Sequence, residues 1–177
     1  MPLTANPAQY SVAIIATSSI VPLINGDLIR PLDDLVAKYG QSLDPSQLIK
    51  IDGRIMAVAF MTNAQHLYYR KDILEKAGVQ PPKTYEEVLA AAKAVRDAGI
   101  MEYPFALNTK SGWNLAEEFV NMHLGLGGTF FKEGTAEPAI NNETGVKTLN
   151  MLKELLAYSN PDFLTFDSNA TQALWES

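Results

Sequence analysis

The sequence predicts an α/β fold, because short apolar runs typical of buried strands alternate with longer amphipathic segments typical of helices. Apolar residues make up 47% of the 177 positions and charged residues 19%, which is ordinary for a folded globular protein. No internal repeat or low-complexity tract interrupts the alternation. A chain of this length can bury a core of its own.

The composition also argues against several classes of function. A formal net charge of −6 disfavours the nucleic-acid phosphate backbone as a partner. The absence of cysteine excludes a disulfide framework, a thiolate metal site and a cysteine nucleophile. No apolar stretch approaches the roughly 18–20 residues that cross a bilayer, so we do not expect the chain to span a membrane. Residues 1–7 lack the basic region and apolar run of a signal peptide.

The first elements expected along the chain are a strand and a short helix. Residues 12–16 are a short apolar run of the kind that forms a buried strand. Thr17, Ser18 and Ser19 follow, and they are expected to cap a helix that ends near Gly26.

Proline and Asp-Gly signals organise the next part of the chain. Pro31 is expected to open a helix, and Asp44 to start another short turn or helix. The pair at residues 52–53, Asp-Gly, predicts a hairpin-type turn. Residues 55–69 are expected to be extended and to end in an aromatic strand over 67–69.

Helix start and stop signals are strongest in the middle of the chain. Residues 71–77 are expected to form a helix that Gly78 stops. Thr84 and Glu87 form a capping box for a helix that runs to about residue 98. Its inward positions are expected to be Val88, Ala91, Ala92 and Val95.

Another strand and three more helices complete the pattern. Residues 105–107 are a short apolar run expected to be a strand, and residues 113–124 a helix. Asn142 is expected to cap a helix to about residue 158, and Ser168 to cap a last helix. The inward positions of the helix after Asn142 are expected to be Val146, Leu149, Leu152, Leu155 and Leu156.

Two adjacent motifs carry a resemblance to a known family. Residues 67–78 read Leu-Tyr-Tyr-Arg-Lys-Asp-Ile-Leu-Glu-Lys-Ala-Gly, and residues 81–87 read Pro-Pro-Lys-Thr-Tyr-Glu-Glu. Together they resemble the family 1 extracellular solute-binding proteins of ABC importers, of which maltose-binding protein is the best-known relative. Tyr85 stands where tryptophan is commoner in that family.

Three further segments agree with the resemblance and extend it over nearly the whole chain. Residues 26–34 are similar to the family's G-x-L-x-P-L-D segment. Residues 51–59 are similar to its approach to the hinge, with Ala59 in place of proline. The glycine pair near residue 128 and the helix start over 138–145 also match in order.

The resemblance implies a type II periplasmic-binding-protein-like fold, with mostly the second lobe and a piece of the first. Residues 1–59 would be the end of the first lobe leading to the hinge, and residues 60–177 the second lobe, truncated at its C-terminal side. Family members are usually about twice this length or more, so we expect an incomplete chain.

The implied function is that of the substrate-binding component of an ABC importer. It would bind a small solute, with a sugar or oligosaccharide favoured, in a cleft between two lobes, and it would work with a membrane permease. The implied location is periplasmic or extracellular. No cofactor, metal or catalytic residue is implied, so the chain is not expected to be an enzyme. Relatives also bind polyols, phosphorylated glycerol, polyamines and metal ions, and the sequence does not choose among these.

Trp113 is the most informative candidate ligand residue. It follows a polar loop, residues 108–112, directly after a predicted buried strand, and by resemblance this is where an aromatic ring faces a sugar. The alternative is that its indole packs the start of its own helix. Asn108 and Lys110 in the same loop are further candidates, although a lone loop lysine is more often only solvated.

The remaining candidates come from two other segments. Asn63 and Gln65 lie where the chain is expected to cross between lobes, and their amides can bond to ligand hydroxyls or cap the backbone. Ser18 and Ser19 follow the first predicted strand, where relatives contact ligand, but a helix cap also explains them.

Two competing functions remain. A carbohydrate-active hydrolytic enzyme would need a pair of carboxylates facing one cleft, and no acidic pair is visible at a strand end. His66 and His123 are too isolated in sequence to suggest a zinc site. A truncated domain that binds no ligand, or an interaction module with an exposed strand edge, is the other alternative.

Overall fold

The computed structural model describes residues 9–176, apart from the side chain of Ser18. Contacts divide the chain into two compact units: unit 1 is Met1–Ala64 and unit 2 is Gln65–Ser177. Within the described residues, no helix is both long enough and apolar enough to cross a bilayer.

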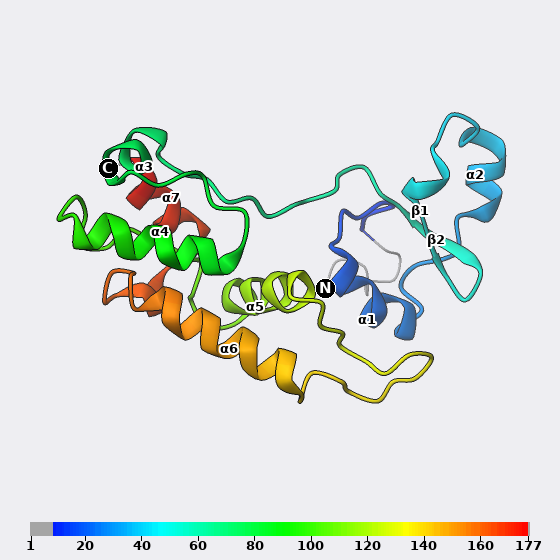
Figure 1. The fold of residues 1–177 in the computed structure, drawn as a ribbon. Helices are drawn as coiled ribbons and strands as arrows, with labels where there is room; N and C mark the ends of the chain where they lie inside the picture. The colour runs from blue at the N-terminus through cyan, green and yellow to red at the C-terminus, as the bar shows by residue number, and fades with distance from the viewer. Residues whose placement is uncertain (1–8, 177) are drawn as a thin grey trace. The chain divides into compact units, whose positions relative to one another are not determined.

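Unit 1 contains short helices and one hairpin. The 3-10 helix η2 (Thr17–Ser19) leads into α1 (Ile20–Asn25), and α2 (Asp33–Tyr39) follows a turn. These helices confirm those predicted before Gly26 and after Pro31. The 3-10 helix η3 (Pro45–Gln47) confirms the predicted short turn and leads into the hairpin of β1 (Leu48–Ile51) and β2 (Arg54–Val58) (Figure 1).

The hairpin turns at the predicted Asp-Gly pair. Asp52 and Gly53 both adopt positive φ, 49° and 75°, as the central residues of a type I′ turn must. β1 and β2 pair antiparallel, and Asp33 joins α2 to β2. Its carboxylate accepts hydrogen bonds from Arg54 Nε at 2.9 Å and from the backbone N–H of Ile55 at 3.3 Å.

The strand predicted over residues 12–16 does not form. The segment is not assigned to a strand, and the side chains of Val12 and Ile14 are 83% and 81% exposed. A strand needs a neighbouring strand for its backbone hydrogen bonds. Among residues 9–176 the strands β1 and β2 pair with each other, and neither pairs with this segment.

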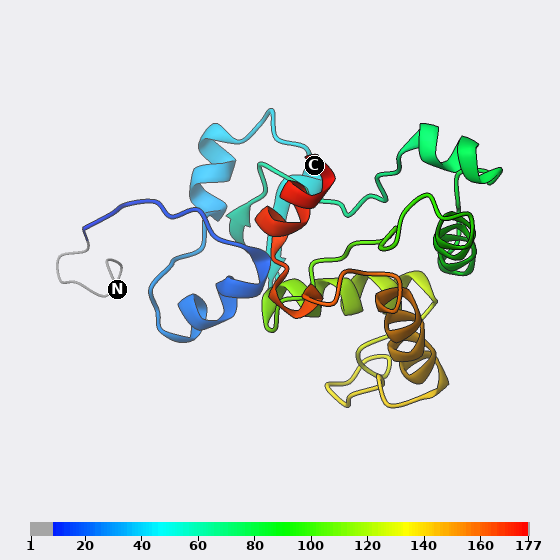
Figure 2. The same ribbon diagram turned by 90° about the vertical axis from the view of Figure 1, so that its left-hand side faces the viewer.

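Unit 2 is built from helices. They are α3 (Lys71–Ala77), α4 (Tyr85–Asp97), α5 (Trp113–Gly125), α6 (Glu143–Leu156), the 3-10 helix η4 (Phe163–Thr165) and α7 (Ser168–Glu176). Helix α6 contacts both α4 and α5. Figure 2 shows α4 nearly end-on while α5 lies across the page, so these two helices cross instead of running parallel.

Side chains cap the N-termini of three helices, with two differences from prediction. Thr84 Oγ1 accepts the N–H of Glu87 at 3.1 Å as expected, but the Glu87 carboxylate accepts the N–H of Lys83 at 2.6 Å instead of that of Thr84. Asn142 caps α6 as predicted, accepting the N–H of Gly145 at 2.9 Å. The first turn of α7 is bonded by the residue before Ser168: Asp167 accepts the N–H of Ala170 at 3.1 Å.

The core of unit 2 lies where α5 and α6 meet. Its buried members are Met122, Met151, Leu152 and Leu155. Partly buried side chains from α4, α5 and the loops pack around them: Tyr85, Val88, Leu89, Phe105, Leu107, Phe119 and Leu126. The predicted inward face of α4 is confirmed, because Ala91, Ala92 and Val95 are buried and Val88 packs on the core.

The predicted inward face of α6 is partly wrong. Val146 and Leu149 are 54% and 53% exposed, whereas Thr148 is fully buried. The buried stripe runs through positions 148, 151, 152 and 155, the spacing of a single helix face.

His123 explains why a threonine lies on that stripe. Its ring is fully buried and stacks on Phe119 at 5.4 Å. Nδ1 lies 3.3 Å from the hydroxyl of Thr148 on α6, and Nε2 lies 3.2 Å from the carbonyl oxygen of Thr129. A Cβ atom at Gly128 would come within 2.3 Å of the imidazole, so this close approach requires glycine.

The strands predicted over residues 67–69 and 105–107 also do not form. Residues 67–69 are exposed and unpaired with any described strand, and His66, expected in the same strand, is exposed as well. Residues 105–107 belong to no ladder, although Phe105 and Leu107 pack on the core of unit 2. Both segments have the composition of strands, but pairing depends on strands supplied by other parts of a chain.

Candidate ligand-binding site

The loop over residues 107–113 is fixed to unit 2 by hydrogen bonds from both sides. The N–H of Lys110 donates to the carbonyl of Phe166 at 2.8 Å, and the buried hydroxyl of Thr109 donates to the carbonyl of Phe163. Thr171 Oγ1 lies 3.4 Å from the carbonyl oxygen of Leu107. The loop therefore carries its outward side chains on an anchored backbone.

Gly112 connects the loop to α5. Its φ of 102° and ψ of −137° lie where side-chain-bearing residues are strained, and it is the N-cap residue of the helix. Trp113 follows as the first helical residue, with 59% of its surface exposed. The described residues thus leave the indole largely accessible, unlike the interpretation in which it only packs the helix start.

Lys110 is paired with a carboxylate. Its Nζ lies 3.0 Å from Asp167 Oδ2. Hydrogen bonds from the backbone of Ala170 and from Lys110 hold the pKa of Asp167 below its usual value. The one cation among the predicted site residues is therefore already balanced.

Asn108 is held by a residue that the sequence analysis did not select. Its backbone N–H donates to Oε1 of Glu118 at 3.2 Å. Its side-chain oxygen is buried and accepts no hydrogen bond from any described residue. Asn108, Lys110 and Trp113 thus share one loop, and Glu118 of α5 contacts that loop.

Burial raises the pKa of Glu118, the hydrogen bond from Asn108 opposes the shift, and the charge of Glu117 adds to it. The charge of the Glu118 carboxyl group also acts on Tyr85 of α4. Burial raises the pKa of Tyr85, the charge of Glu118 raises it further, and a hydrogen bond from Asn121 at 3.1 Å opposes both.

The sequence gives no clear indication that Glu118 or Tyr85 belongs to this site. Adjacent glutamates on a helix are typical of a solvated face, and burial of Glu118 arises only when the loop folds against α5. Tyr85 had a weak signal, since it places a hydroxyl where the resembling family more often has tryptophan.

The other predicted ligand residues lie outside this loop. Asn63 and Gln65 are exposed in a segment without helix or strand; Asn63 belongs to unit 1 and Gln65 to unit 2. Neither caps the backbone of another described residue. Ser19 is exposed at the N-cap position of α1, but its hydroxyl makes no capping bond. The side chain of Ser18 lies outside the described residues.

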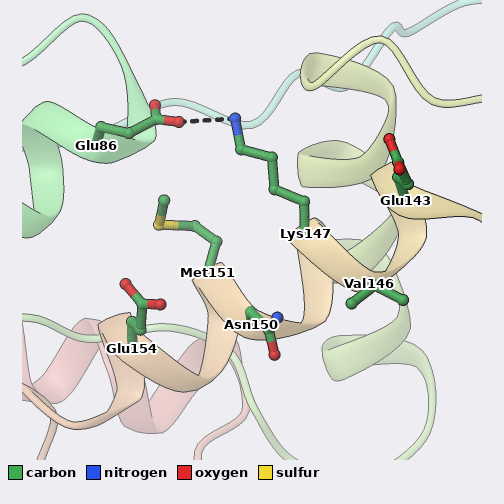
Figure 3. A pocket seen from close by; sticks show the side chains of 7 residues that line it. All are labelled: Glu86, Glu143, Val146, Lys147, Asn150, Met151 and Glu154. Carbon is green, nitrogen blue, oxygen red and sulfur yellow. Dashed lines mark ion pairs between the residues drawn. The ribbon is translucent and has the colours of Figure 1, made fainter.

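A surface hollow of about 590 Å³ lies on α6 beside the start of α4, away from these candidates. Figure 3 shows Glu86 of α4 facing Lys147 of α6, which it meets at 2.9 Å. The lining residues are Glu86, Glu143, Val146, Lys147, Asn150, Met151 and Glu154. None of the predicted site residues is among them, and the exposed ion pair is worth little to stability.

Comparison with known proteins identifies the chain's relatives. Residues 3–177 match the model of the bacterial extracellular solute-binding protein family. The sn-glycerol-3-phosphate-binding periplasmic protein UgpB of Agrobacterium fabrum is 30% identical over 129 residues, which are 62% of this chain and 29% of that protein. The chain thus spans less than a third of the length of this curated relative.

Two solved structures are similar to this chain. A sugar transporter from Arthrobacter chlorophenolicus with bound laminaribiose matches with a TM-score of 0.71 and 26% identity, over 84% of this chain and 39% of that one. A solute-binding protein of an ABC transporter from Agrobacterium radiobacter, in complex with ribitol, matches with a TM-score of 0.74 and 26% identity, over 86% and 40% of the two chains.

A third solved structure, maltose-bound MalE3 of T. maritima, supports the fold. It matches with a TM-score of 0.73 at 23% identity. The expected type II periplasmic-binding-protein fold class is therefore confirmed, even though three of the strands expected within it are absent. The homologues are solute-binding proteins, which are not enzymes.

Proposed function

Because the chain belongs to the bacterial extracellular solute-binding protein family, we propose that it is the substrate-binding component of an ABC importer for a sugar or oligosaccharide. The proposal includes a membrane permease as partner and a periplasmic or extracellular location. It treats residues 1–59 and 60–177 as parts of two lobes whose hinge closure encloses the solute.

The observation that carries the proposal is the exposed indole of Trp113 on an anchored polar loop. Sugars bind well where an aromatic face is flanked by a few fixed hydrogen-bonding groups. Trp113 supplies the ring, and Asn108 and Lys110 supply polar groups within a few residues of it. An anchored backbone reduces the ordering cost of binding.

The remaining predicted contacts belong to the proposal. The amides of Asn63 and Gln65 are exposed and free to bond to solute hydroxyls, as is the hydroxyl of Ser19. Ser18 is included on the resemblance. Each such hydrogen bond adds on the order of 1 kcal/mol to binding.

The test is isothermal titration of the full-length protein with laminaribiose, maltose, ribitol and sn-glycerol 3-phosphate. Trp113→Ala is expected to weaken binding of the preferred saccharide by about tenfold or more, since a stacked aromatic residue contributes roughly 1–3 kcal/mol at such sites. Trp175→Ala is the matched control, because Trp175 is the other exposed tryptophan and lies on α7.

The control variant is expected to bind within about threefold of the wild type. The proposal fails if neither laminaribiose nor maltose binds. The assignment of Trp113 fails if both tryptophan variants lose affinity equally.

A further inference from the structure

We propose that Glu118 is a specificity-determining residue of the Trp113 loop, one that disfavours anionic solutes relative to uncharged ones. The inference rests on the proposed function and concerns the same site. Three observations carry it: the contact between Glu118 and the loop, the lack of an ion pair between Glu118 and any described cation, and the pairing of Lys110.

Glu118 touches the loop directly. Its Oε1 accepts the backbone N–H of Asn108 at 3.2 Å, and its side chain is partly buried. The neighbouring Glu117 is exposed and makes no such bond. Of this acidic pair, Glu118 is therefore the one whose charge lies at the loop backbone.

No described basic side chain forms an ion pair with Glu118. The charge of Glu117 on its own helix raises the pKa of Glu118, and the charge of Glu118 in turn acts on Tyr85 of α4; neither neighbour is a cation. Burial raises the pKa of Glu118, because a partly buried carboxylate is solvated less well than an exposed one.

The cation on the loop is already balanced. Lys110 is paired with Asp167 at 3.0 Å, so its charge is offset before any solute arrives. Glu118 adds a negative charge that accepts the N–H of Asn108 but pairs with no described cation. A phosphate monoester approaching the loop beside Asn108 would be repelled by this charge, whereas the hydroxyls of an uncharged solute would not be.

The solutes named for two similar proteins differ in charge. UgpB of Agrobacterium fabrum is named for sn-glycerol 3-phosphate, an anion, whereas one matched solved structure holds ribitol, an uncharged polyol. The charge balance around Glu118 favours the second kind of solute for this chain.

The experiment compares ribitol and sn-glycerol 3-phosphate as probes in the full-length protein, by isothermal titration at low and at 0.3 M salt. Wild type is expected to bind ribitol at least tenfold more tightly than sn-glycerol 3-phosphate. Glu118→Gln keeps an oxygen that can accept from Asn108 but removes the charge. It is expected to reduce that preference by about tenfold at low salt and by less at high salt.

Glu117→Gln is the matched control, because it makes the same change of charge one residue away and is expected to alter the preference by less than about twofold. Asp167→Asn is a second variant that keeps an oxygen able to cap α7 and frees Lys110. It is expected to shift the preference toward sn-glycerol 3-phosphate, and it tests the charge balance even if Glu118→Gln does not fold.

Each other result overturns the inference. Equal effects of the Glu117 and Glu118 variants would show that only overall charge matters. An equal loss of both ligands in Glu118→Gln would show a purely structural brace. Wild-type preference for sn-glycerol 3-phosphate would remove the selectivity, yet it would leave the role of Trp113 to its own titration. If neither laminaribiose nor maltose binds, the proposed function fails first, and this inference, which rests on it, fails with it.

Discussion

Different interactions stabilise unit 1 and unit 2 internally. Unit 2 has a cluster of buried side chains where α5 and α6 meet, and α4 packs against it. In unit 1 the buried apolar residues among those described are Ile20 and Leu23, and polar bonds to Asp33 tie its hairpin to α2. Burial of apolar surface is the main source of folding free energy. Unit 2 should therefore be the more stable of the two.

The largest effect is expected from opening the core of unit 2. Leu155→Ala removes a fully buried side chain, and we expect it to lower the free energy of unfolding of unit 2 by about 2–5 kcal/mol. Leu149→Ala removes the same side chain from an exposed position of the same helix and should change it by about 0.5 kcal/mol or less.

Urea denaturation of both variants, followed by hydrogen exchange in α6, measures this contrast. Similar losses for the two variants would mean that α6 does not bury the face described here. Faster exchange in β1 and β2 of Leu155→Ala would mean that unit 1 depends on the core of unit 2.

A smaller effect is expected from the polar part of that core. Thr148→Val keeps the shape of the side chain and leaves Nδ1 of His123 without its hydroxyl partner. We expect a loss of about 1–3 kcal/mol, the usual penalty for a buried polar group without a hydrogen bond. Thermal unfolding, with Thr144→Val on the same helix as control, measures it. A neutral result would show that water reaches the imidazole.

Unit 1 is tested best at its turn. Gly53 has a φ of 75° and an added Cβ would meet no atom within 4 Å, so Gly53→Ala changes only the backbone preference. We expect the hairpin to lose about 1–2 kcal/mol. Hydrogen exchange of β1 and β2 should quicken while α6 is unchanged. A loss of protection in both units would contradict an effect confined to the hairpin.

The smallest expected effect depends on pH. Because burial raises the pKa of Glu118 above 4.5, the folded state favours its protonated form. The stability this provides is full below the unfolded pKa and is lost as the pH rises through the folded one. Glu118→Gln should therefore gain in melting temperature over wild type between pH 4 and pH 7.5, by about 1–3 °C. Glu117→Gln should show no such gain, and equal curves for wild type and Glu118→Gln would contradict the burial.

Features that depend on nearby residues could be predicted from the sequence. The Asp-Gly turn, the Thr84 and Asn142 caps and the glycine stop at residue 78 each act within a few positions, and each is present in the structure. Family membership also followed from short motifs, since they occur in order along the chain.

Features that depend on distant partners could not be predicted from the sequence. The apolar runs at residues 12–16, 67–69 and 105–107 have the composition of strands, but strand pairing is a property of two segments and not of one. Thr148 is not among the predicted inward positions of α6; a hydroxyl group is costly to bury without a partner, and its partner His123 lies on another helix. Glu118 was missed for the same reason, since its contact with Asn108 joins a helix to a loop.

The close approach of Gly128 to the imidazole of His123 has an evolutionary consequence. A methyl group at position 128 has no room while the ring is there, so neither residue is free to change by itself. In descendants of this sequence, a larger residue at 128 should appear only after, or together with, a smaller one at 123. The two positions should therefore be inherited as a correlated pair.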